Sequence, residues 1–105
     1  MRLNLYAIYD RCSGVYDRPW CARSDEEAAR SFTHIATNAE HPVGMNPDDF
    51  TCFRVGTWHE TEGTVGAETP EKIINGVEAV SRSREIMPGS LKSNGVDLTA
   101  VGGTD

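Results

Sequence analysis

The sequence lacks long hydrophobic runs and is poor in basic side chains. No apolar run in its 105 residues approaches the ~20 residues that a membrane-spanning helix needs, and residues 1–10 are not built like a signal peptide. Sixteen Asp and Glu outnumber ten Lys and Arg, so the formal net charge is −6. This balance excludes duplex DNA binding through a broad basic face, because that mode needs many cations to neutralise phosphates. We expect a soluble protein that stays where it is made.

Cysteine and histidine are sparse, and their spacing matches no common site. The three cysteines, Cys12, Cys21 and Cys52, form neither a disulfide framework nor a close metal-ligand pair. A Cys₃His zinc site could be drawn through them and His59, but structural zinc sites usually contain a close ligand pair. No Gly-x-Ser-x-Gly elbow or phosphate-binding glycine loop is present. The sequence predicts reduced thiols, no metal, no cofactor, no catalytic residues and no enzyme activity.

The first quarter of the chain has a strand pattern. Leu3, Leu5, Ala7 and Tyr9 alternate with the residues between them, and this period of two is typical of a β-strand. A turn follows at residues 10–14, and a second extended run over residues 15–22 is interrupted by Pro19. Because proline cannot donate to a strand ladder, residues 2–22 predict a hairpin with an irregular second arm.

A helix is expected next. Ser24 and Glu27 form a capping box, in which the serine hydroxyl accepts from the N–H of Glu27 while the glutamate reaches back. Small and apolar residues then recur at helical spacing, giving one apolar stripe. The helix should run from about Asp25 to Asn38 and end before Pro42.

The second half predicts further strands and a tail. Residues 50–59 read as a strand, with Phe50, Cys52, Arg54 and Trp58 on one face and Phe53, Val55, Thr57 and His59 on the other. A turn at 60–63, a short return arm at 64–66 and a weaker segment at 72–74 follow. After Val80 the chain has no aromatics and many Ser and Gly, which favours disorder. We therefore predict an α+β domain over residues 1–80, with a small antiparallel sheet in the order β-β-α-β-β and one helix packed on it, and a flexible tail over 81–105.

Aromatic and arginine side chains are interleaved in the predicted domain. All eight aromatics precede residue 59, and residues 1–24 carry four arginines against two aspartates. Aromatic rings that stack on bases, with cations along the phosphates, are the usual means of holding single-stranded nucleic acid. The candidate nucleic-acid-binding residues are Tyr6, Arg11, Tyr16, Arg18, Trp20, Arg54 and Trp58.

Packing is the competing interpretation of these rings. A small domain has few other large side chains, so Tyr9, Phe32 and either Phe50 or Phe53 are expected in the core. Trp20 could likewise anchor the hairpin, with Trp58 as its cross-strand partner. Tyr6, Tyr16, Trp20, Arg18 and Arg54 remain the better candidates for an exposed face.

An ordered set of segments resembles a known family. The segments are YAIYDR at 6–11, RPW at 18–20, SDEEAARSF at 24–32, NPDDF at 46–50 and RVGTW at 54–58. Together they resemble the small non-structural, DNA-binding protein of gokushoviruses, which are single-stranded DNA phages of the Microviridae. The likeness covers about residues 3–76, contains no catalytic motif and does not extend to the Ser/Gly tail. It implies a role in the phage DNA cycle, in genome replication and packaging, but it identifies no binding residues.

Two function classes follow. The first is a non-enzymatic protein in the host bacterial cytoplasm that binds single-stranded DNA through an aromatic and arginine sheet face, as a homo-oligomer. The second is an acidic adaptor that contacts a replication initiator, procapsid or host factor without binding DNA. A small hydrolase or metal enzyme is a third class, and no residue constellation supports it.

Overall fold

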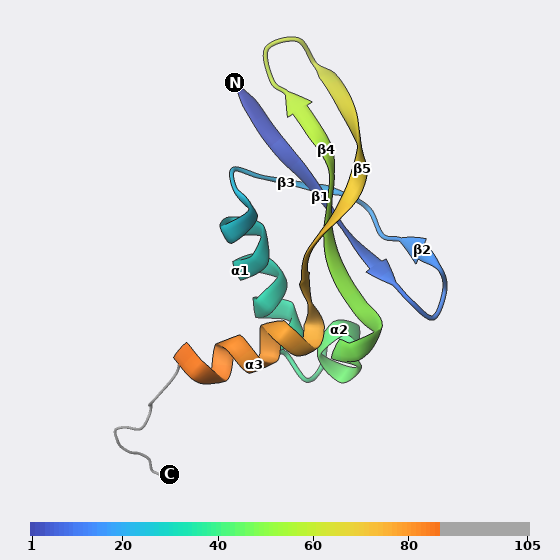
Figure 1. Ribbon diagram of the computed structural model, residues 1–105, viewed down its shortest axis with the longest axis vertical. Helices are drawn as coiled ribbons and strands as arrows, with labels where there is room; N and C mark the ends of the chain where they lie inside the picture. Colours follow the sequence, from blue (N-terminus) through green and yellow to red (C-terminus); the bar gives the residue numbers. More distant parts are fainter. Residues whose placement is uncertain (87–105) are drawn as a thin grey trace.

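The computed structural model describes residues 1–86, and its fold is α+β. The strands are β1 (Arg2–Asp10), β2 (Val15–Tyr16), β3 (Trp20–Ala22), β4 (Phe50–His59) and β5 (Thr64–Asn75); the helices are α1 (Asp25–Ala36), α2 (Pro42–Met45), the 3₁₀ turn η1 (Pro47–Asp49) and α3 (Gly76–Ile86). The sheet is antiparallel in the order β2-β1-β4-β5, with β3 also paired to β1. The long strands β1, β4 and β5 extend above the helices, which gather in the lower part of the view (Figure 1).

The predicted hairpin over residues 2–22 is confirmed, including its irregular second arm. That arm is split into β2, which pairs with the end of β1, and β3, which pairs with its middle. Pro19 lies in the break between them, where no ladder hydrogen bond is needed from its nitrogen. Gly14 has a φ of 75° in the connecting turn, a conformation that favours glycine.

Helix α1 begins at the predicted cap. The Ser24 hydroxyl accepts from the N–H of Glu27 at 3.1 Å, and the Glu27 carboxylate accepts from the N–H of Arg23 at 2.7 Å, one residue before the cap. The helix ends at Ala36, two residues before the predicted Asn38. Its buried residues come from the expected stripe: Ala28, Ala29, Phe32 and Ala36.

The core lies between the sheet and helices α1 and α3. Tyr6, Cys52 and Ile74 are the largest fully buried side chains of β1, β4 and β5, and Phe32 is the largest of α1. The expectation that Tyr9 belongs to this core is wrong, because Tyr9 lies on the opposite side of β1 from Tyr6. Of the two alternatives on β4, Phe50 packs against the core and Phe53 does not.

A bulge in β4 overturns the predicted alternation of that strand. Tyr6 pairs with Arg54 and Leu5 pairs with Gly56, so Val55 is an extra residue in β4. An extra residue shifts the period-two pattern by one, and every later side chain changes face. Trp58 therefore lies on the face opposite Arg54, which corrects the prediction that the two share a face.

The last part of the domain also differs from expectation. The arms predicted at 64–66 and 72–74 are parts of one strand, β5. Residues 81–86, assigned from the sequence to the flexible tail, belong to helix α3; residues 87–105 lie outside the described part of the chain. A Cβ on Gly76 would collide with the carbonyl oxygen of Pro47, so glycine allows α3 to begin against η1. Within residues 1–86 no helix is long and apolar enough to cross a membrane.

Candidate functional site

The two faces of the sheet have different chemistry. Residues paired across an antiparallel ladder share a face. The register therefore assigns one set of side chains, the open face, to the side away from α1 and α3; it comprises Leu3, Leu5, Ala7, Tyr9, Tyr16, Cys21, Thr51, Phe53, Gly56, Trp58, Val65 and Ala67. Lys72 and Asn75, the ladder partners of Phe53 and Thr51, lie beside a register shift in β5 and bond to Glu78 of α3. None of these residues is acidic, although the whole chain has a net charge of −6.

Three rings meet on the open face, and we call them the aromatic cluster: Tyr9, Tyr16 and Phe53. The Tyr9 and Tyr16 centroids are 4.9 Å apart, and that of Phe53 lies 6.2 Å from Tyr9 and 5.6 Å from Tyr16 in edge-on geometry. Such tilted contacts are favourable for aromatic pairs and hold each ring in place. Tyr16 remains 43% exposed. The cluster is therefore a positioned aromatic surface that solvent can reach.

The upper part of the open face is also apolar. Trp58 is half-buried and pairs with Leu3 on one side and with Val65 on the other. Val65 is 64% exposed. Leu3 and Tyr9 are six residues apart along β1, which corresponds to about 20 Å in an extended strand. Trp58 and the aromatic cluster thus lie at two ends of one apolar face.

The helix-covered face carries a polar network centred on Arg54. Its guanidinium donates to both oxygens of Asp25 at 2.9 and 3.0 Å, forms an ion pair with Glu68 at 3.5 Å, and also pairs with Glu71. The Tyr6 hydroxyl donates to Asp25 at 2.7 Å. Because Asp25 is the first residue of α1, this Arg54 network joins the start of the helix to β1, β4 and β5.

The environment of this network shifts two pKa values. Burial, together with the hydrogen bond to Asp25, raises the pKa of Tyr6 to about 12. The hydrogen bond with Asp25 raises the pKa of Arg54, and the nearby carboxylates act in the same direction. Tyr6 is therefore a neutral hydrogen-bond donor at physiological pH. Arg54 already has carboxylate partners, and a phosphate would have to displace them.

The structure divides the seven sequence-predicted site residues between locations. Tyr16 and Trp58 lie on the open face, whereas Tyr6, Trp20 and Arg54 lie on the helix-covered face; Arg11 pairs with Asp48 and Asp49, and Arg18 is exposed in the link between β2 and β3. The expected exposure of Tyr6 is wrong, since its exposed fraction is 0%. Trp20 stacks near Tyr6, with centroids 5.9 Å apart, and it does not face Trp58.

Sequence reasoning missed two members of the aromatic cluster. It placed Tyr9 in the core and treated Phe53 as an alternative core residue. A usable signal was present, because Tyr9 and Tyr16 flank the turn at residues 10–14 at positions that pair in the hairpin. No local pattern connects Phe53 to them, since its place depends on how β4 pairs with β1.

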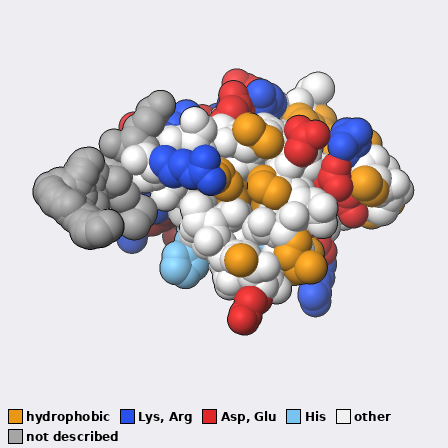
Figure 2. Space-filling view, turned by 90° about the horizontal axis from the view of Figure 1, so that it is seen from below, with side chains coloured by type: hydrophobic (Ala, Val, Ile, Leu, Met, Phe, Trp, Pro, Cys, Tyr) orange, Lys and Arg blue, Asp and Glu red, His pale blue; other side chains and the backbone are white. Residues whose placement is uncertain are grey.

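The cysteines and charged groups add no reactive cluster among the described residues. Burial raises the pKa of the Cys52 thiol to about 12, and a hydrogen bond with Asp49 raises that of Cys12. Both thiols are therefore protonated at neutral pH. Within residues 1–86 no group of three or more His, Cys, Asp and Glu side chains could hold a metal ion. At the lower end of the molecule, separate hydrophobic patches lie between acidic and basic side chains (Figure 2).

Comparison with known proteins identifies a family. No curated protein and no solved structure matches the chain. A family model described as Phage ORF5 protein matches residues 3–79, a span that runs from the second residue of β1 to the start of α3. The resemblance to a phage family is confirmed at this level. With most of its length matched by that model, the chain belongs to the phage ORF5 protein family.

Proposed function

We propose that this phage protein binds single-stranded DNA on the open face of its sheet. The observation that carries the proposal is the aromatic cluster, a solvent-accessible group of rings on a face without carboxylates in an acidic protein. Bases stack on such rings whatever their sequence, and each stacked base contributes about 1–3 kcal/mol. In a phage, this binding would act on the single-stranded genome during its replication and packaging.

Tyr16 is the main stacking surface in this proposal. It is the most exposed ring of the cluster, and Tyr9 and Phe53 support it by edge contacts. A base placed on Tyr16 meets a ring that is already oriented, so little side-chain entropy is lost on binding. Trp58 provides a second aromatic surface toward the other end of β1. A bound strand would run along β1 between the two.

Arg18 is the phosphate contact in this proposal. It follows Tyr16 by two residues, is exposed, and its side chain has no ion pair with any residue in 1–86. Arg11 and Arg54 are paired with carboxylates, and Lys72, the ladder partner of Phe53, is paired with Glu78. Binding should therefore depend more on stacking than on charge. With one or two phosphate contacts, the slope of log affinity against log salt is expected near −1.

Fluorescence anisotropy with a labelled oligo-dT tests the proposal. Tyr16→Ala should weaken binding by roughly 5- to 150-fold, the equivalent of one stacked base. Tyr16→Phe, which keeps the ring, should bind like the native protein. Arg18→Ala should weaken binding and flatten the salt dependence, whereas its matched control Arg30→Ala, an exposed arginine on α1, should not. Absence of binding at low salt, or equal affinity of Tyr16→Ala and Tyr16→Phe, would overturn the proposal.

A further inference from the structure

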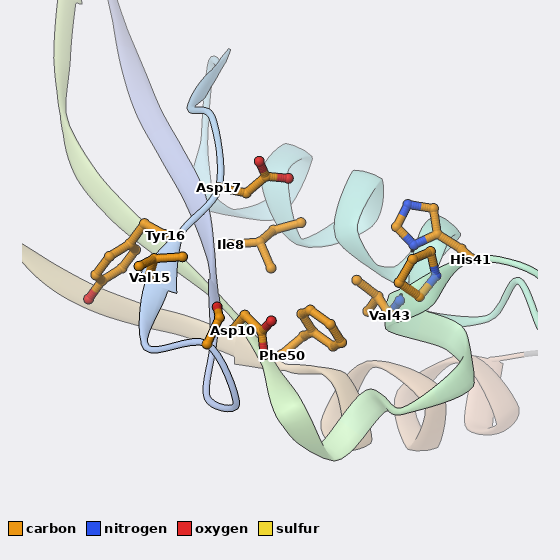
Figure 3. A pocket seen from close by; sticks show the side chains of 10 residues that line it. Ile8, Asp10, Val15, Tyr16, Asp17, His41, Val43 and Phe50 are labelled. Carbon is orange, nitrogen blue, oxygen red and sulfur yellow. Dashed lines mark hydrogen bonds between the residues drawn. The ribbon is translucent and has the colours of Figure 1, made fainter.

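A pocket of about 400 Å³ lies between the β1–β2 hairpin and α2, on the side of the hairpin opposite the aromatic cluster. Ile8, Val43 and Phe50 form its apolar floor (Figure 3). Asp10 and Asp17 border it from the hairpin, and His41 borders it from the start of α2. The proposed DNA binding on the open face gives this pocket no role.

Two carboxylates at the pocket have no compensating charge. Asp10 accepts from the backbone N–H of Cys12 at 2.9 Å, and Asp17 accepts from that of Arg18 at 2.8 Å. Neither forms an ion pair with a residue of the described chain, whereas Asp25 and Asp49 elsewhere are both paired with arginine. Two carboxylates beside an apolar floor favour a cation and repel a phosphate. The pocket therefore has the opposite preference to a DNA-binding surface.

The His41 imidazole at the edge of the pocket is compatible with a cation. His41 accepts the N–H of Val43 at its Nδ1, at 3.1 Å. A neutral imidazole with an acceptor at Nδ1 carries its proton on Nε2. The ring is held in place by this bond at the start of α2, so it forms a fixed edge of the pocket.

We propose that this pocket binds a lysine or arginine side chain of a partner polypeptide. Long basic side chains pack their aliphatic stems on apolar surface while the charged head stays at a polar edge. Here the stem would lie on Ile8 and Phe50, and the head would lie between Asp10 and Asp17.

Three features support a polypeptide as the occupant. The volume accommodates one long side chain. Val15, which is 59% exposed and also lines the pocket, offers apolar contact to a residue next to the bound one. The net charge of −6 attracts a basic partner at longer range. These features agree with the acidic adaptor, the second function class that the sequence suggests.

The pocket and the aromatic cluster lie on the two sides of one hairpin, and Tyr16 borders both. Adjacent residues of a strand point to opposite faces, so Val15 faces the pocket while Tyr16 joins the cluster. Figure 3 shows the Tyr16 ring directed away from the pocket floor. Binding in the pocket can be measured without DNA, so failure of this inference can be told apart from failure of the proposed DNA binding.

Titration of the full chain with a short arginine peptide, capped at both ends and with leucines beside the arginine, tests the inference. Amide NMR shifts should move at Asp10, Asp17 and Val43 and saturate. The double variant Asp10→Asn, Asp17→Asn keeps both acceptor oxygens but removes the charges, and it should weaken binding at least tenfold. The matched control Glu60→Gln, Glu62→Gln removes two exposed charges at the opposite hairpin and should bind as the native protein does.

Four results would contradict this inference, each at a different step. If both double variants weaken peptide binding equally, the peptide is held by general charge attraction, and the assignment of its binding to the pocket is overturned. If a citrulline peptide, which lacks the charge, binds equally well, the claim that the pocket recognises a cation is overturned. Equal binding of free arginine amide would assign the pocket to a small amine instead of a polypeptide. No saturable shift at these amides would overturn the site altogether.

Discussion

The two faces of the sheet use the same types of residue in opposite ways. On the helix-covered face, Tyr6 and Arg54 are tied to Asp25 in a hydrogen-bonded network. On the open face, Tyr9 and Tyr16 contact other rings and solvent. A tyrosine on the first face is therefore a structural support, whereas a tyrosine on the second is available to a ligand. Position in the sheet, and not residue type, separates the two roles.

The acidic side chains of the described residues lie away from the open face, which leaves that surface free of carboxylates. Asp25, Glu68 and Glu71 converge on Arg54 on the helix-covered side. Other acids lie at turns and helix starts, where they accept backbone N–H groups, as Glu27, Asp10 and Asp17 do. Net charge therefore describes long-range attraction but not the chemistry of either face.

The largest expected effect is on the helix-covered face. Tyr6→Ala removes a fully buried ring and should lower the free energy of unfolding by about 3–5 kcal/mol, as for other large aromatics. Urea denaturation followed by circular dichroism measures this. Tyr6→Phe, which keeps the ring and loses only the hydroxyl contacts, should cost about 1 kcal/mol. A loss for Tyr6→Ala no larger than that for Tyr6→Phe would contradict the assignment of Tyr6 to the core.

The next effect is expected at the Arg54 network. Arg54→Met leaves Asp25, Glu68 and Glu71 close together without their cation, and the free energy of unfolding should fall by about 1–2 kcal/mol. This figure is modest because the three carboxylates are partly exposed. Added salt should recover part of the loss by screening the acids. A loss that is unchanged by salt would show that packing, not charge, dominates at Arg54.

Alkaline pH should sharpen the contrast between the buried and exposed tyrosines. The pKa of Tyr6 in the folded protein is raised from 10.0 to about 12. The contribution of neutral Tyr6 to the free energy of unfolding is therefore complete below pH 10 and is lost as the pH rises toward 12. Unfolding titrations at several pH values should show a steeper decline for the native protein than for Tyr6→Phe. The pKa of the Cys52 thiol is also raised to about 12, so Cys52 contributes a further decline in stability in both proteins. Parallel declines would mean that Tyr6 has no raised pKa.

The smallest stability effect is expected on the open face. Tyr16→Ala removes ring contacts with Tyr9 and Phe53 from an exposed position, and the free energy of unfolding should fall by only about 0.5–1.5 kcal/mol. The same variant should show the largest loss of oligonucleotide affinity. A large stability loss for Tyr16→Ala, measured by urea denaturation beside Tyr6→Ala, would remove the distinction between the two faces.

Local signals were sufficient for several elements. The capping box at Ser24 predicted the start of α1, and the apolar pattern of residues 50–59 predicted the bounds of β4. Both depend on interactions within a few residues. Helix α3 was missed, because its buried residues, such as Ala79, pack on distant elements and the Ser-rich composition after Val80 was misleading.

The candidate site depended on longer-range information. Tyr16 and Arg18 were chosen from composition alone, but Tyr9 and Phe53 join Tyr16 only because β4 pairs with β1 in one register. The bulge at Val55 also moves Trp58 to the open face, and no residue pattern in β4 predicts this bulge. A shift of one residue reverses which side chains face the helices.

By itself, the sequence determined the α+β class, the order of the main elements, the start of the helix and the excess of acid, because these follow from composition and short-range contacts. Only the tertiary structure decided which face each ring occupies, which arginines already have partners, and that Asp10 and Asp17 border a pocket. Those properties arise where strands far apart in the chain pair, and the register of that pairing is a property of the whole sheet.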